Sequence, residues 1–223
     1  MKRWPGYGIT VGLRKMDDKI RTFVAIRLPE NVLHAMGKVQ DELRKPDFNI
    51  RWVRPHGIHL TLKFLGDVHR KDLEPLGMAL AKTAEAVSPF TLRGTGVGVF
   101  PNARRPRVIW VGLSGEMQDL LELQGRLEAH LESLGHPREK RPFRGHLTLG
   151  RIKGRVDTPR LIKYLEALKD FYTDPFVVGS IVLFQSTLRP QGAVYTALAE
   201  ARLGVPAGDC AKLSRSVALQ QQC

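Results

Sequence analysis

Cysteines and acidic residues are scarce in this sequence, and long apolar runs are missing from it. Its 223 residues include two cysteines, Cys210 and Cys223, both too close to the C-terminus to cross-link a core. No Cys/His spacing resembles a zinc site, and no apolar run approaches the roughly 18–20 residues that span a membrane. We therefore expect a cytoplasmic protein that uses no membrane, no metal and no cofactor.

Acidic side chains are outnumbered, because 35 lysines and arginines face 22 aspartates and glutamates, for a formal net charge of +13. Residues 1–19 carry +3 and residues 201–223 carry +2, which leaves +8 on residues 20–200. This excess indicates an anionic partner and says nothing about the fold. The two ends lack periodicity, so we interpret residues 1–19 as an N-terminal extension, 20–200 as the domain and 201–223 as a flexible tail.

The 43% hydrophobic residues of the chain exclude wholesale disorder, and their spacing predicts alternating strands and helices. The predicted strands are residues 22–28, 58–65, 90–99, 108–113, 144–152, 176–184 and 193–198. The predicted helices are residues 30–43, 70–87, 117–134 and 158–168.

A repeat organises these elements. His59-Leu60-Thr61-Leu62 recurs 87 residues later as His146-Leu147-Thr148-Leu149, and a strand and a helix precede each copy. A helix, a Pro-Phe pair that enters a strand and an Arg-Pro turn follow each copy in the same order. We therefore predict an α+β fold of two pseudo-twofold-related lobes, with antiparallel sheets, outer helices and an active-site groove between the lobes.

The repeated motif carries chemistry suited to a phosphodiester. Strand alternation puts each His and Thr on the face opposite the two leucines, and the symmetry brings both His-x-Thr faces to one groove. One imidazole can accept a proton near neutral pH while the other donates one. The hydroxyls of Thr61 and Thr148 and the guanidinium of Arg151 are suited to bind phosphate oxygens.

Other side chains near the motifs have weaker claims to a role. Alternation would turn His56 to the opposite face from His59, so we interpret it as structural. Trp52, Phe64 and Phe143 are candidates both for stacking on a base and for the core. Basic clusters flank the second motif and are suited to guide a nucleic-acid backbone toward the groove.

The paired motifs resemble the two-histidine (2H) phosphoesterases, and above all the LigT-like RNA 2′,3′-cyclic phosphodiesterases, also called 2′-5′ RNA ligases. The resemblance covers residues 20–200. Besides the motifs it rests on Thr22-Phe23-Val24-Ala25-Ile26, Leu62-Lys63-Phe64-Leu65-Gly66, Gly98-Val99-Phe100-Pro101, Arg105-Pro106, Arg144-Gly145-His146, Leu183-Phe184-Gln185-Ser186 and Leu188-Arg189-Pro190.

The resemblance implies metal-independent hydrolysis of RNA 2′,3′-cyclic phosphate ends, such as those of tRNA fragments, to 2′-phosphomonoesters. It implies His59 as proton donor, His146 as proton acceptor, and Thr61, Thr148 and Arg151 as phosphate-binding residues. We expect the protein to be a monomer. Reversible 2′-5′ RNA ligation is related chemistry. Two alternatives stay open: a 2H enzyme acting on 2′-5′ oligonucleotides or small nucleoside cyclic phosphates, and a non-catalytic RNA-binding module.

Overall fold

The protein is described by a computed structural model that covers residues 18–190 and 192–206. The extension expected over residues 1–19 and the tail expected over 201–223 lie mostly outside this range, as do both cysteines. The last strand runs to Arg202, and Ala201 and Leu203 are buried, so the folded domain continues past residue 200.

Every predicted strand and helix forms, with shifted ends. The strands are β1 (Lys19–Arg27), β2 (Ile50–Trp52), β3 (His59–His69), β4 (Phe90–Phe100), β5 (Val108–Gly115), β6 (Leu147–Ile152), β7 (Phe176–Val178), β8 (Ser180–Arg189) and β9 (Gly192–Arg202). The α-helices are α1 (Glu30–Arg44), α2 (Leu73–Glu85), α3 (Met117–Glu132) and α4 (Thr158–Glu166), and Pro55–Gly57 and Arg70–Asp72 form short 3₁₀ helices. The strand predicted over 176–184 is divided between β7 and β8.

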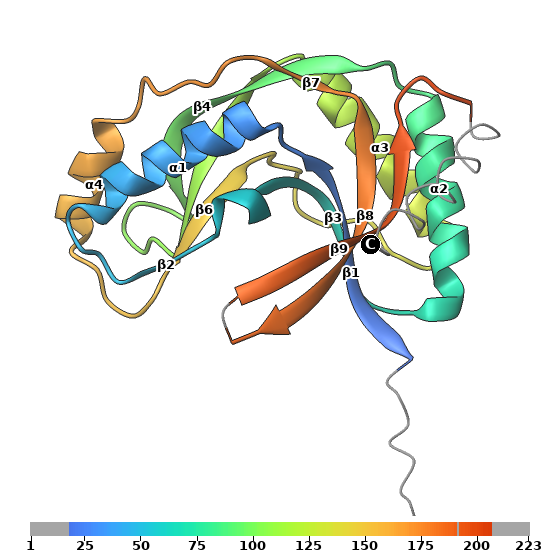
Figure 1. The fold of residues 1–223 in the computed structure, drawn as a ribbon, viewed down its shortest axis with the longest axis horizontal. Helices are drawn as coiled ribbons and strands as arrows, with labels where there is room; N and C mark the ends of the chain where they lie inside the picture. The colour runs from blue at the N-terminus through green and yellow to red at the C-terminus, as the bar shows by residue number, and fades with distance from the viewer. Residues whose placement is uncertain (1–17, 191, 207–223) are drawn as a thin grey trace, which may run out of the picture.

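The strands form one continuous antiparallel sheet in the order β7-β4-β5-β6-β3-β1-β8-β9, with β2 paired to β6. The sheet curls, and its helices cover the outer face: α1 and α4 over one half, α2 and α3 over the other (Figure 1). The α+β class and the paired lobes are therefore confirmed, and the two lobes share a single sheet.

The two sequence repeats are interleaved in space. Strand β4 belongs to the first repeat but pairs with β5 of the second, and β8 of the second repeat pairs with β1 of the first. The helices follow the same exchange, because α3 of the second repeat packs on α2 and β3 of the first. Each lobe thus contains elements of both repeats, so neither repeat forms a lobe by itself.

A buried ion pair ties β3 to the helix that comes from the other repeat. Lys63 is 3% exposed, and its Nζ lies 2.6 Å from Oε2 of Glu128 on α3 and 2.8 Å from the carbonyl oxygen of Pro137. Gln124 donates a further hydrogen bond to Oε1 of Glu128 over 3.0 Å. The network anchors the strand that carries the first motif to the helix layer.

Candidate active site

The two motifs meet at the junction of the lobes. Strands β3 and β6 pair through Leu60 and Leu147, the same motif position in each repeat, so the pseudo-twofold axis passes between these leucines. Antiparallel pairing at that point places His59 beside Thr148 and His146 beside Thr61. Both leucines are fully buried under the helices, which leaves the four polar side chains on the opposite, concave face.

The two imidazoles are held in the same way. His59 Nδ1 lies 2.9 Å from the carbonyl oxygen of Gly57, and His146 Nδ1 lies 2.7 Å from the carbonyl oxygen of Arg144, each two residues before the ring. A carbonyl oxygen only accepts, so each Nδ1 is the protonated nitrogen of its neutral ring and Nε2 is left for proton transfer. This matched geometry is what a pair of acid and base catalysts needs.

Aromatic rings surround His59. The ring of Phe23, from β1, lies 4.8 Å from the imidazole centroid, and Tyr195, from β9, meets it edge-on at 5.0 Å. Phe184 continues the cluster, because it stacks on Phe23 at 5.3 Å. These contacts fix the plane of the imidazole and remove water from most of its surface.

His146 rests on a smaller aromatic stack. Phe100, at the end of β4, meets its ring edge-on at 5.0 Å, and Trp110 lies 5.0 Å beyond Phe100. The indole lies flat on Gly98, where an added Cβ would come within 2.4 Å of the Trp110 ring. Only glycine therefore lets Trp110 support Phe100 in this position.

Burial lowers the pKa of His59 below its usual 6.5, because an imidazolium is poorly solvated there. The Gly57 carbonyl opposes this shift, and the positive charge of a protonated His146 adds to it. The free protein therefore holds His59 largely neutral at pH 7, and an anion in the groove would favour its protonated form.

We expect the NMR titration midpoint of His59 to lie below 6.5 in the free protein and to rise when a nucleoside 2′-monophosphate binds. The midpoint lies below 6.5 because burial penalises the imidazolium form, and it rises on binding because a phosphate anion stabilises that form. The resonance is assigned by its loss in H59Q. A midpoint at or above 6.5 without ligand would contradict the described surroundings of the ring.

A β-bulge in each motif strand decides which further side chains reach the concave face. Strict alternation would turn Arg151, five residues after His146, toward the core. The register of β5 and β6 shifts by one residue at Leu149, and this shift returns Arg151 to the face of His146. The equivalent shift in β3, at Leu62, buries Lys63 and exposes Phe64.

The second bulge is supported from the helix layer. Gln40, fully buried on α1, donates from Nε2 to the carbonyl oxygen of Leu149 over 2.8 Å and to that of Val53 over 2.7 Å. The Leu149 carbonyl also accepts from the amide of Val53, which follows β2. This arrangement holds β2 against β6 and fixes the direction of Arg151.

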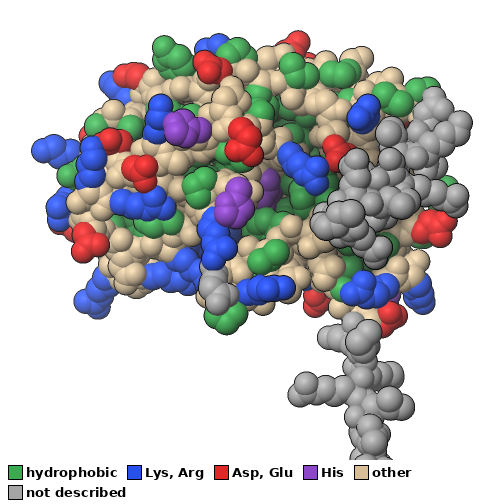
Figure 2. All heavy atoms as spheres, viewed as in Figure 1, with side chains coloured by type: hydrophobic (Ala, Val, Ile, Leu, Met, Phe, Trp, Pro, Cys, Tyr) green, Lys and Arg blue, Asp and Glu red, His purple; other side chains and the backbone are tan. Residues whose placement is uncertain are grey.

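A cavity of about 720 Å³ opens on the concave face beside His59. Its wall contains five cations and no Asp or Glu among the described residues: Arg21, Arg51, Arg54, Arg151 and Lys153. The β8–β9 hairpin, which β3 and β1 separate from β6 in the sheet (Figure 1), supplies residues of the opposite wall. Lysines and arginines gather over the side of the molecule that carries β2 and α4 (Figure 2). The cavity is therefore suited to bind an anion beside His59.

The predicted residues hold different places around this cavity. His59 and Arg151 line it, whereas His146, Thr61 and Thr148 lie beside it at the β3–β6 junction. The described residues contain no group of three or more His, Cys, Asp or Glu side chains placed to hold a metal ion. No helix in the described ranges has the length and apolar character to cross a membrane.

The paired histidine motifs on a duplicated α+β fold are shared with a known protein family. The model described as LigT like Phosphoesterase matches the chain twice, over residues 26–110 and 111–195. The chain belongs to the LigT-like phosphoesterase family. The two matches divide the chain between the two histidine motifs, in agreement with the duplication.

Relatives named RNA 2′,3′-cyclic phosphodiesterase are similar to this chain over most of its length. The RNA 2′,3′-cyclic phosphodiesterase of Methanothermobacter thermautotrophicus is 32% identical over 185 residues, which are 83% of this chain and 100% of the relative. The enzyme of the same name from Thermus thermophilus is 37% identical over 186 residues, covering 80% of this chain and 88% of its own.

Solved structures of LigT-like phosphoesterases share the fold. A protein from Thermus thermophilus superposes with a TM-score of 0.70 and 30% identity, covering 83% of this chain and 98% of that one. The structure of E. coli LigT complexed with 3′-AMP superposes with a TM-score of 0.69 and 25% identity, and the match covers 84% of this chain and 99% of that one.

Sequence reasoning missed several residues of this LigT-like site. His56 lies in the 3₁₀ helix Pro55–Gly57, so the alternation argument was wrong for it, and it lines the cavity. Of the stacking candidates, Trp52 and Phe64 line the cavity, whereas Phe143 packs against the core. No sequence pattern indicated that Tyr195 belongs to the site, because its position depends on how β9 folds back beside the first repeat.

Proposed function

We propose that this protein hydrolyses RNA 2′,3′-cyclic phosphate ends to 2′-phosphomonoesters without a metal ion. The observation that carries the proposal is the Leu60–Leu147 pairing, which brings the two His-x-Thr pairs to one face with each Nδ1 bound to a carbonyl. Relatives of 32% and 37% identity are named RNA 2′,3′-cyclic phosphodiesterases, and the related E. coli LigT binds 3′-AMP.

In the proposed reaction His146 Nε2 takes a proton from water, whose oxygen forms a bond to phosphorus. The bond from phosphorus to the 3′-oxygen breaks, and His59 Nε2 gives its proton to that oxygen. The product keeps its phosphate on the 2′-oxygen. Each histidine finishes in the opposite protonation state, and exchange with solvent restores both.

The proposed roles of the remaining site residues follow from charge. Thr61 and Thr148 would donate hydrogen bonds to the non-bridging oxygens, and Arg151 would neutralise the phosphate as negative charge grows on it. The same anion would stabilise the protonated form of His59, which the free protein disfavours. Substrate binding therefore prepares the acid.

All five proposed site residues come from one chain, so we propose that the protein acts as a monomer. The RNA ends that it would meet include tRNA fragments, and the scarcity of cysteine supports a cytoplasmic location. Residues 20–200, continued to the end of β9, would make up the catalytic domain, and the residues on either side would lie outside the catalytic machinery.

The assay that tests the function uses a defined oligoribonucleotide with a 2′,3′-cyclic phosphate end in excess EDTA. We expect turnover to survive chelation at the rate measured without EDTA, because the proposed acid and base are both imidazoles. The same RNA with a linear 3′-phosphate is the control and should not react. Loss of turnover that added Mg²⁺ or Zn²⁺ restores would indicate a metal-dependent reaction instead.

A further inference from the structure

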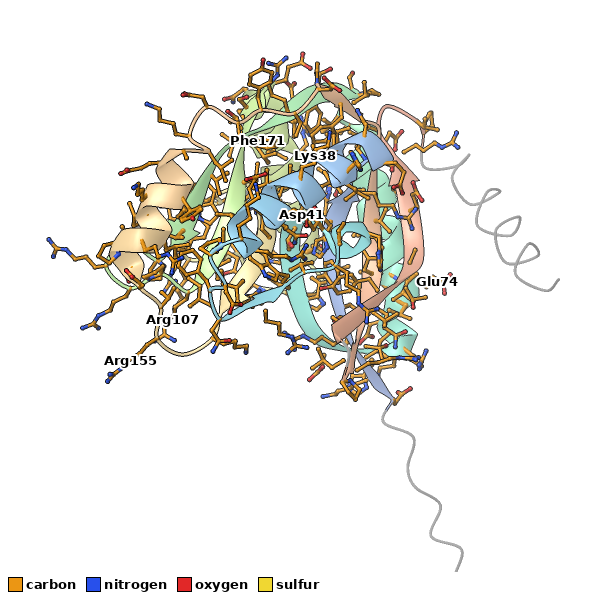
Figure 3. All side chains as sticks on the ribbon, turned by 60° about the vertical axis from the view of Figure 1, so that its left-hand side comes forward. Lys38, Asp41, Glu74, Arg107, Arg155 and Phe171 are labelled. Carbon is orange, nitrogen blue, oxygen red and sulfur yellow. The ribbon has the colours of Figure 1, made fainter. Side chains whose placement is uncertain are left out.

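A row of cations leads away from the cavity along one edge of the concave face. Arg51 on β2, Arg151 and Lys153 at β6, Arg107 before β5 and Arg155 after β6 form this cationic strip. Three of them line the cavity: Arg51, Arg151 and Lys153. Arg107 and Arg155 lie beyond it and project outward from the same end of the molecule (Figure 3).

Two members of the cationic strip face each other directly. Arg51 pairs with Arg151 in the β2–β6 register, and both side chains are exposed. Directly opposite side chains in an antiparallel pair lie about 5 Å apart, and like charges in such a pair are destabilising. The fold therefore carries an electrostatic cost here that a bound anion would remove.

The cationic strip makes no ion pair with a carboxylate among the described residues. Several cations elsewhere on the surface are ion-paired, for example Arg27 with Glu200 at 3.1 Å and Arg126 with Glu122 at 2.8 Å. The nearest acidic residue in the sequence, Asp157, accepts a hydrogen bond from the amide of Arg160 and caps α4. The positive charge of the strip is left for a ligand outside the chain.

The opposite wall of the cavity is different in character. Besides Arg21 on β1, it presents Phe64 and the apolar or aromatic hairpin residues Leu188, Val194 and Tyr195. An RNA end has one reactive phosphate, one terminal base and a strand that continues in one direction only. The cationic wall suits the continuing phosphates, and the aromatic wall suits the base.

We propose that the cationic strip binds the phosphodiesters upstream of the cyclic end, so that the preferred substrate is an RNA strand rather than a cyclic mononucleotide. This inference rests on the proposed function for the identity of the end in the groove. Arg107 and Arg155 contact upstream phosphates, and Arg51 and Lys153 contact those nearest the cavity.

The test measures binding and does not depend on turnover. A fluorescent hexaribonucleotide with a 2′-phosphate end is titrated by anisotropy against the parent protein and R107Q/R155Q, from low to moderate salt. The parent should bind it at least tenfold tighter than a nucleoside 2′-monophosphate. The double variant should bind the hexamer about tenfold more weakly at low salt. Its plot of log K against log salt should be less steep by about 1.4, or about 0.7 for each lost contact.

R126Q is the matched control for binding, and hydrolysis by the parent protein is measured separately. R126Q removes a cation that is ion-paired on α3, and it should keep the parental affinity and salt slope. An unchanged slope in R107Q/R155Q, with thermal unfolding like that of the parent, would overturn the inference and leave the proposed function intact. Failure of the parent to hydrolyse any 2′,3′-cyclic phosphate would overturn the proposed function, while the binding slopes would still decide whether the strip holds RNA.

Discussion

Replacing His59 or His146 with alanine should lower kcat for 2′,3′-cyclic phosphate hydrolysis by about 10²–10⁴-fold, the usual contribution of a general acid or base. The two rings are proposed to move protons in the same transition state. The double variant should therefore be about as slow as the slower single variant, rather than showing the product of both losses. Steady-state kinetics on one cyclic-phosphate oligonucleotide measure all three variants.

The histidine variants need a check that separates lost chemistry from lost folding. Each Nδ1 bonds only to a carbonyl two residues away, so the substitutions remove no contact between lobes through that nitrogen. H34A, which changes a histidine on the surface of α1, is the matched control and should keep the parental rate. Parental kcat in both H59A and H146A would show that the catalytic assignment is wrong.

Replacing Lys63 with methionine should lower the free energy of unfolding by about 3–5 kcal/mol, because it leaves the buried Glu128 carboxylate without its counter-charge. That carboxylate would keep its hydrogen bond from Gln124 but lose the Lys63 ammonium at 2.6 Å. Urea unfolding monitored by circular dichroism gives the difference, provided that the unfolding slope m is unchanged.

Two further variants show whether the loss comes from burying an unpaired charge. K63M/E128L removes both charges and should recover much of the lost stability, since a hydrophobic replacement of a buried pair is often neutral. R126M breaks an exposed pair on the same helix, which is worth at most about 1 kcal/mol. A loss below about 1 kcal/mol in K63M would show that water reaches Glu128 and that the pair is not what joins β3 to α3.

The duplication and the element types could be predicted because they are local properties of the chain. The His-Leu-Thr-Leu repeat stands in the sequence, and the spacing of Val32, Met36, Val39 and Leu43 reports a helix with one buried face. The exchange of β4 and β8 between lobes could not be predicted. The apolar residues of β4 show that one face of the strand packs on the core, but they do not show which strand lies next to it.

The side chains around the two motifs were harder to predict for three physical reasons. Strand β2 has only three residues, which is too short for an alternating pattern to be recognised in the sequence. The position of Arg51 opposite Arg151 could therefore not be predicted. The bulges at Leu62 and Leu149 invert alternation, and neither residue differs from an ordinary strand leucine. Phe23 lies in a strand that is apolar on both faces, where alternation carries no information.

The phosphate position in the product of the EDTA assay tests the central claim most directly. Protonation of the 3′-oxygen by His59 and attack of water activated by His146 leave the phosphate on the 2′-oxygen, and ³¹P NMR of the product distinguishes the two isomers. The proposed mechanism predicts a 2′-phosphomonoester as the product in the presence of EDTA. A 3′-phosphomonoester would contradict the arrangement of donor and acceptor, and an unreacted cyclic phosphate would contradict the proposed activity itself.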